Sequence, residues 1–134
     1  MNPMRVLLAG VAAFVVYFVL GGLFFAASPL KKEFMQFPAV YRTQESMKPV
    51  MPIGMAGMLL AMIALSALYA WSTAAGRGLV HGAEFGALVA LYALGSFVLH
   101  NHVNLNIGWR LTIGQAVAYS VQWVVVGIVI ALVY

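Results

Sequence analysis

Four apolar stretches dominate the chain, and each is long enough to cross the hydrocarbon core of a bilayer as a helix. They run over residues 6–27, 50–71, 79–99 and 111–133. A membrane-spanning helix needs about 20 consecutive, mostly apolar residues. No Lys or Arg lies within these stretches, and Glu84 is the only acidic residue in them. The pattern predicts four transmembrane spans.

We expect these stretches to form helices rather than strands. Within hydrocarbon, backbone hydrogen bonds must be made inside the protein, which leaves α-helices or a closed β-barrel. Barrel strands alternate apolar and polar residues, whereas these stretches are continuously apolar. Of all residues, 64% are hydrophobic and 7% are charged, against about 45–50% and about 25% in soluble domains. We therefore expect an all-α integral membrane protein, a four-transmembrane-helix bundle of up-down-up-down topology with one domain over residues 1–134.

The cationic residues predict which ends of the spans face the cytoplasm. The connections 28–49 and 100–110 contain Lys31, Lys32, Arg42, Lys48 and Arg110. The opposite side contains Arg5 and Arg77. By the positive-inside rule, five cations against two place these connections in the cytoplasm and both chain ends in the periplasm or outside. The first stretch exceeds the roughly 7–15 apolar residues of a signal peptide, so we expect it to be retained.

The connection between the first two spans contains an amphiphilic segment, residues 30–41. Its mixture of aromatic, apolar and cationic residues suits the lipid headgroup interface. The predicted interfacial residues are Lys31, Lys32, Arg42, Trp109 and Arg110. The competing interpretation is an ordinary connector. Membrane lipid is the expected partner. The net charge of +4 does not indicate nucleic acid, because the cations form no clustered basic face.

Two spans contain small residues at helical spacing, the pattern along which helices pack closely in lipid. In the span 50–71 they are Gly54, Gly57, Ala61 and Ala64. In the span 79–99 they are Gly82, Gly86, Ala90, Ala93 and Ser96. The second stripe predicts that the span 79–99 is the central helix and touches a neighbour closely.

The last span contains a row of polar residues. Gln115, Tyr119 and Gln122 follow one another at spacings of four and three residues, which places them on one helix face. Such groups are expected to face the bundle interior, because an unpaired polar group in hydrocarbon is costly. They indicate either hydrogen bonds between helices or the lining of a small polar pocket.

His81 and Glu84 lie three residues apart at the start of the third span, a spacing that places them on one helix face. An ionisable residue within a span is a functional candidate. The alternative is an interfacial pair in which Glu84 contacts Arg77 or His81. With one acidic residue in the spans, a carboxylate-bridged metal site is not expected.

The densest polar cluster lies between the last two spans. Its members are His100, Asn101, His102, Asn104 and Asn106. Imidazole can bind a metal, a haem or a proton near neutral pH, and two histidines two residues apart could share a ligand in an extended turn. Asn is common in turns because of its local hydrogen bonds. The cluster therefore indicates either a ligand or proton site or a structured connection.

Nothing in the sequence matches a catalytic pattern. The absence of cysteine excludes disulfides and thiolate chemistry. The chain also lacks a nucleophile–base pair, a metal-binding signature and a phosphate-binding loop. We therefore expect a protein that is not an enzyme and has no resident cofactor.

Three segments carry a resemblance to a known group of proteins. They are Gly21-Gly22-Leu23-Phe24-Phe25 with Ser28-Pro29-Leu30, Gly82-Ala83-Glu84-Phe85-Gly86-Ala87-Leu88, and Leu105-Asn106-Ile107-Gly108. In this layout, the chain resembles a family of small bacterial four-helix membrane proteins known only as domains of unknown function. The resemblance implies a bacterial inner-membrane location and supplies no activity or catalytic residue.

Three functional hypotheses follow. The first is a non-enzymatic bundle that acts by self-association, as an accessory subunit of a larger complex, or by binding lipid or a small apolar ligand. The second is a small oligomeric transporter or channel that uses the polar row of the last span and the histidine cluster. The third is a redox protein with haem or a metal bound by His100 and His102.

Overall fold

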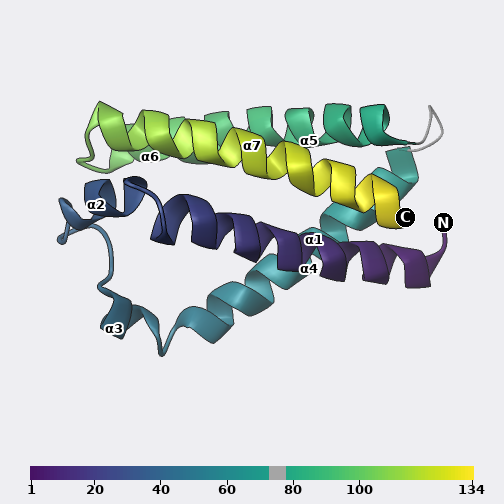
Figure 1. Cartoon of the computed structure of the whole chain (residues 1–134), viewed down its shortest axis with the longest axis horizontal. Helices are drawn as coiled ribbons and strands as arrows, with labels where there is room; N and C mark the ends of the chain where they lie inside the picture. The colour runs from purple at the N-terminus through teal and green to yellow at the C-terminus, as the bar shows by residue number, and fades with distance from the viewer. Residues whose placement is uncertain (73–77) are drawn as a thin grey trace.

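The computed structural model describes residues 1–72 and 78–134, and this part of the chain is helical without strands. Four continuous helical segments are long and apolar enough to cross a membrane. They are Pro3–Ala26, Met51–Ser72, Leu79–Asn104 and Trp109–Val133. The predicted all-α architecture with four long apolar helices is confirmed. Both chain ends lie at one end of the elongated molecule (Figure 1).

Two of the long segments contain a π-helical turn. The first comprises α1 (Pro3–Gly21) and the π-helix η1 (Gly22–Ala26). The third comprises α5 (Leu79–Ala93), the π-helix η3 (Leu94–Leu99) and α6 (His100–Asn104). We expected the third span to end at residue 99, followed by a turn. The helix instead continues to Asn104. No Gly or Pro interrupts residues 100–104.

The helix at the centre of the packing is α7 (Trp109–Val133), not the third span as predicted. It packs against α5 along one side and against α1 along another, whereas α4 (Met51–Ser72) packs mainly on α1. The reason is that α7 presents two packing faces. One is a small-residue face around Gly127 and the other is the row of polar side chains that includes Gln122.

The close contact predicted for the glycine stripe of α5 is present. A Cβ atom placed on Gly86 would lie 2.5 Å from the carbonyl oxygen of Trp123 and 2.7 Å from Cα of Val124. One placed on Gly82 would lie 2.8 Å from the carbonyl oxygen of Gly127. Only glycine lets the two backbones approach this closely, as in other small-residue helix contacts.

On its other side, α1 packs against α4 through small residues. Ala9 and Ala13 are fully buried there beside Met62, and a Cβ on Gly10 would lie 2.9 Å from Cα of Ile63. The same buried cluster includes Tyr69, Phe85, Val126 and Ile130. The core therefore joins all four long helices at the end where the chain termini lie.

Towards its N-terminus, α4 leaves the other helices. Figure 1 shows it crossing α1 obliquely and running away from it towards the short helix α3 (Gln44–Met47). Every residue from 51 to 57 is exposed, and a Cβ on Gly54 or Gly57 would meet no atom within 4 Å. This half of α4 has no close neighbour in the described part of the chain.

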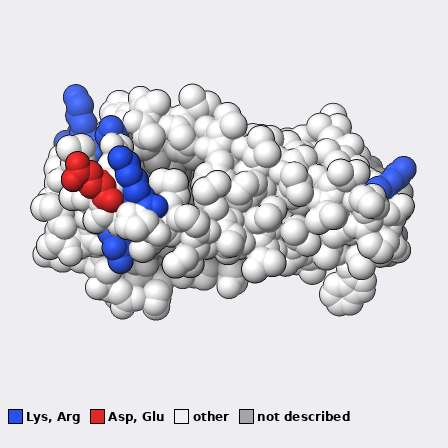
Figure 2. Space-filling view, turned by 90° about the horizontal axis from the view of Figure 1, so that it is seen from below, with Lys and Arg blue, Asp and Glu red and all other residues white. Residues whose placement is uncertain are grey.

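The end of the molecule opposite the termini is basic. It contains α2 (Leu30–Met35), α3 and α6, and Figure 2 shows Lys and Arg gathered there. Trp109 is exposed near this end and Trp71 is exposed near the other. Exposed tryptophans at both ends of an apolar band are typical of aromatic belts at membrane interfaces.

Candidate functional site

The polar row of α7 forms a hydrogen bond between helices. Gln115 and Gln122 are buried and Tyr119 is half-buried. The Nε2 amide of Gln122 donates to the carbonyl oxygen of Tyr17 on α1 at 2.7 Å. This contact lies one helical turn before the π-helix η1, and the neighbouring Gly21 leaves room for the amide. The sequence did not indicate that Tyr17 would be the partner.

Aromatic rings occupy the space around the middle of this row. The ring of Tyr119 lies 5.1 Å from that of Phe25 in η1 and 5.6 Å from that of Phe97 in η3. The ring of Trp123 lies 5.2 Å from that of Tyr17. Of the two interpretations of the row, the geometry favours a packed contact between helices.

Some polar atoms in this row and beside it are buried without a hydrogen-bond partner in residues 1–72 and 78–134. They are Oε1 of Gln115, Oε1 of Gln122 and Nε1 of Trp123.

Two surface hollows of about 550 and 400 Å³ lie away from this row, beside the chain termini. The first is lined by Met1, Ala64, Ala67, Leu68, Ala70 and Trp71. The second is lined by Met1, Asn2, Arg5 and Tyr134.

The histidine cluster is spread over the surface of α6 and the turn that follows. His102 shares a hydrogen bond of 2.8 Å with Oγ1 of Thr112, and its ring lies 3.9 Å from that of Trp109. Oγ1 of Thr112 also lies 3.3 Å from the carbonyl oxygen of Gly108, so it connects His102 to the start of α7. His102 therefore helps to join α6 to α7.

The other members of the cluster do not converge on His102. His100, Asn104 and Asn106 are exposed, and Asn101 is half-buried. The stretch is helical rather than an extended turn, and residues two apart do not share a helix face. Among residues 1–72 and 78–134, no group of three or more His, Cys, Asp or Glu side chains could hold a metal ion.

At the basic end, α2 docks on the start of α7. Leu30 lies against Gly114, where a Cβ would collide with its side chain. The ring of Phe34 lies 5.9 Å from that of Phe25 and 4.8 Å from that of Tyr41. These contacts hold the outward face of α2 in place. Among the predicted interfacial residues, Lys31, Lys32, Arg42, Trp109 and Arg110 are all exposed.

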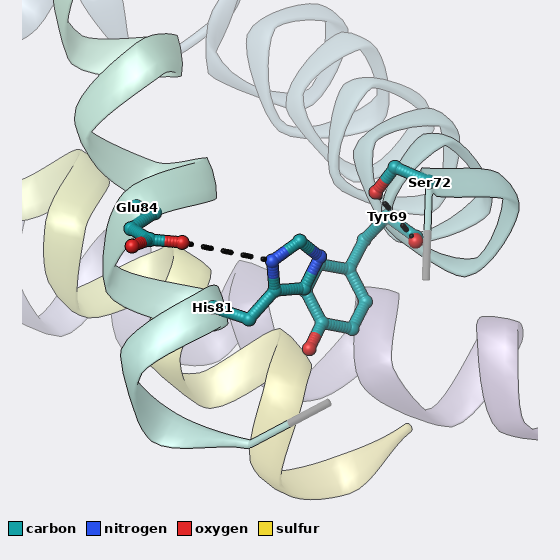
Figure 3. A network of polar contacts seen from close by, with 4 residues as sticks. All are labelled: Tyr69, Ser72, His81 and Glu84. Atoms are coloured by element: carbon teal, nitrogen blue, oxygen red, sulfur yellow. Dashed lines mark hydrogen bonds and ion pairs between the residues drawn. The ribbon is translucent and has the colours of Figure 1, made fainter. Parts of the chain in front are cut away.

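His81 and Glu84 form a pair at the opposite end, as Figure 3 shows. Nδ1 of His81 lies 3.8 Å from Oε2 of Glu84, and the imidazole lies 5.4 Å from the ring of Tyr69 on α4. The Glu84 side chain is 69% exposed. The other partner we considered for Glu84, Arg77, lies outside the described residues.

An exposed stripe of small residues runs along α4. Gly54, Gly57, Ala61 and Ala64 are exposed, and the stripe continues at Leu68. The buried residues of α4, which are Met62, Ser66, Tyr69 and Ala70, lie on the opposite face. The four small residues were predicted from the sequence. Leu68 was not, although it continues the same alternating spacing of three and four residues.

Comparison with known proteins adds no further constraint. No protein-family model matches the chain, and neither the curated proteins nor the solved structures include a significant match to it.

Proposed function

We propose that this chain crosses a bacterial inner membrane four times in up-down-up-down order and functions without catalysis, by self-association through α4. The basic end would face the cytoplasm and both chain ends the periplasm or outside. Four long apolar helices, exposed tryptophans near both ends and five cations at one end support this placement. The exposed stripe along α4 is the observation that carries the proposed self-association.

The stripe has the spacing that two helices need to pack along their whole length. Its positions, 54, 57, 61, 64 and 68, alternate steps of three and four residues. This is the heptad spacing of left-handed helix pairs, with glycine and alanine where large residues would hold the backbones apart. In lipid, close packing between such faces is a main source of association.

A second copy of the chain is the occupant that fits this surface. A two-fold axis parallel to α4 would bring the stripe against its own copy, so that each small residue meets another small residue. The first half of α4 has no close neighbour in the described chain, which leaves room for a second bundle. The hollow beside Ala64 and Leu68 extends this surface towards the end of the helix.

The same geometry argues against a path for solute through a single copy. Gln122 is hydrogen-bonded to α1, and Tyr119 lies between two aromatic rings. A packed row of this kind stabilises a bundle, whereas transporters typically place broken helices around a site at the membrane midplane.

The proposal is tested by the mass of the protein in lipid nanodiscs. We expect a dimer for the unmodified chain and at least a tenfold weaker association for Ala61→Leu, because leucine on the stripe separates the backbones. Ala56→Leu is the matched control, since Ala56 is also exposed but lies off the stripe. A monomer for the unmodified chain, or equal masses for the two variants, would overturn the proposal. So would a monomer that copurifies with a different protein bound at α4, which would indicate an accessory subunit.

A further inference from the structure

The basic end contains more cationic than acidic side chains. This end contains Lys31, Lys32, Arg42, Lys48 and Arg110, with Glu33 and Glu45 as its acidic residues. Five positive and two negative side chains leave an excess of three positive charges. At the other end, the described residues are balanced, with Arg5 against Glu84. The excess positive charge of the described residues is therefore concentrated at the basic end.

The helix α2 presents two of these cations on a fixed support. Leu30 and Phe34 lie one turn apart and contact α7 and η1, respectively. Lys31 and Lys32 are exposed on the remaining face of this short helix. Because Leu30 and Phe34 hold α2 against the bundle, the backbone that carries Lys31 and Lys32 is fixed at this end of the molecule.

Arg110 adds a third cation beside α2. Its Nε lies 4.0 Å from Oε1 of Glu33, while its side chain remains 87% exposed. The Glu33 carboxylate is mostly covered, so it orients the guanidinium from the protein side. An exposed pair at this distance contributes little to stability. The remaining N–H groups of Arg110 are therefore open to a further anion.

Apolar side chains border these cations. Met35 is 70% exposed at the end of α2, and Trp109 is 62% exposed next to Arg110. A soluble anion such as free phosphate would gain nothing from them. A phospholipid has an anionic headgroup above acyl chains, and it would contact the cations and the apolar side chains together.

We propose that Lys31, Lys32 and Arg110 form a binding site for the headgroup of an anionic phospholipid in the leaflet at the basic end of the bundle. The phosphate oxygens accept hydrogen bonds from the two ammonium groups and from the outward N–H groups of the guanidinium. The lipid glycerol and first acyl carbons lie against Met35 and Trp109. This site rests on the proposed membrane placement, but it is separate from the α4 stripe and does not depend on self-association.

The site is tested with the full chain by native mass spectrometry, adding phosphatidylglycerol or phosphatidylcholine to the detergent-solubilised protein. We expect phosphatidylglycerol to bind selectively. Each Lys or Arg near a headgroup contributes about 1 kcal/mol, so the double variant Lys31→Gln/Lys32→Gln is expected to bind it about 30-fold more weakly.

The matched control is Arg42→Gln/Lys48→Gln, which removes the same charge from the same end but from residues outside the proposed site. We expect this variant to bind phosphatidylglycerol as the unmodified chain does, within about threefold. Equal losses in the two double variants would overturn the site and leave only general attraction between charges. Equal binding of the two lipids by the unmodified chain would overturn it as well. Equal competition by soluble glycerophosphate would overturn the phospholipid assignment, because the acyl contacts would then contribute nothing.

Discussion

Gly127 on α7 lies directly against Gly86 on α5, and a Cβ atom on Gly127 would come within 2.7 Å of both Cα and N of Gly86. The two backbones touch without a side chain between them. This contact fixes the pairing of α5 with the central helix. Helix α5 packs mainly on α7 and uses one small-residue face for this contact, whereas α7 packs on both α5 and α1 and therefore uses two faces.

The first prediction concerns this contact. Gly86→Ala is expected to lower the free energy of unfolding by about 1–3 kcal/mol, because the new methyl group would collide with the backbone of α7. Gly22→Ala is the matched control, since a Cβ there would meet nothing within 4 Å. Its stability should equal or exceed that of the unmodified chain. Unfolding titrations in mixed detergent micelles measure both, and equal stability of the two variants would contradict the close contact.

The second prediction concerns the hydrogen bond from Gln122 to Tyr17. Hydrogen bonds between membrane helices contribute about 0.6 kcal/mol on average, and Gln122→Leu also removes a buried Oε1 atom without a partner in the described chain. We expect this variant to change the free energy of unfolding by less than about 1 kcal/mol.

Gln122→Ala is expected to cost more, about 2 kcal/mol or above, because it leaves a cavity in the fully buried position. The same unfolding titration compares the two variants. If leucine were as damaging as alanine, packing would not be the main contribution of this side chain, and the polar row would have a role that our account lacks.

The third prediction separates the two neighbouring histidines. His102→Ala should lower the free energy of unfolding by about 1–3 kcal/mol, because it loses the bond to Thr112 and the ring contact with Trp109. His100 is exposed, so His100→Ala should stay within about 0.5 kcal/mol of the unmodified chain. Similar effects of the two substitutions would count against His102 as the residue that joins α6 to α7.

The fourth prediction concerns sidedness. Since the chain has no cysteine, single cysteines can be placed at Lys48 and at Ser72 without altering any other residue. A membrane-impermeant maleimide should label the cysteine at 72 in intact cells. It should label the cysteine at 48 only after the membrane is permeabilised. The reverse pattern would place the basic end outside and refute the orientation expected from the cations.

Much of the helical architecture was predictable from the sequence. Apolar length alone located four helices, because the cost of exposing backbone groups to hydrocarbon is local to each stretch. The glycine stripe through Gly82 and Gly86 correctly predicted a close contact. The end of the third helix was missed because the histidine and asparagine residues from 100 to 104 suggested a turn, although they contain no helix-breaking residue.

The arrangement of the helices was not predictable in the same way. Hydropathy does not specify which apolar faces meet, so the central place of α7 and the divergence of α4 from the bundle were not foreseen. The polar row was located correctly at Gln115 and Gln122, but its partner is a backbone carbonyl at Tyr17. Every residue has a backbone carbonyl group, so the pattern of side chains does not indicate which carbonyl will accept the hydrogen bond.

Disulfide cross-linking in native membranes tests the proposed self-association through α4 most directly. Single cysteines would replace Gly57 or Ala61 on the stripe and Ala56 off the stripe. A disulfide forms only when two Cα atoms come within about 7 Å. We expect covalent dimers under mild oxidation for the cysteines at 57 and 61 and none for the cysteine at 56. Cross-linking at none of the stripe positions, or equally at all three, would contradict the proposed self-association.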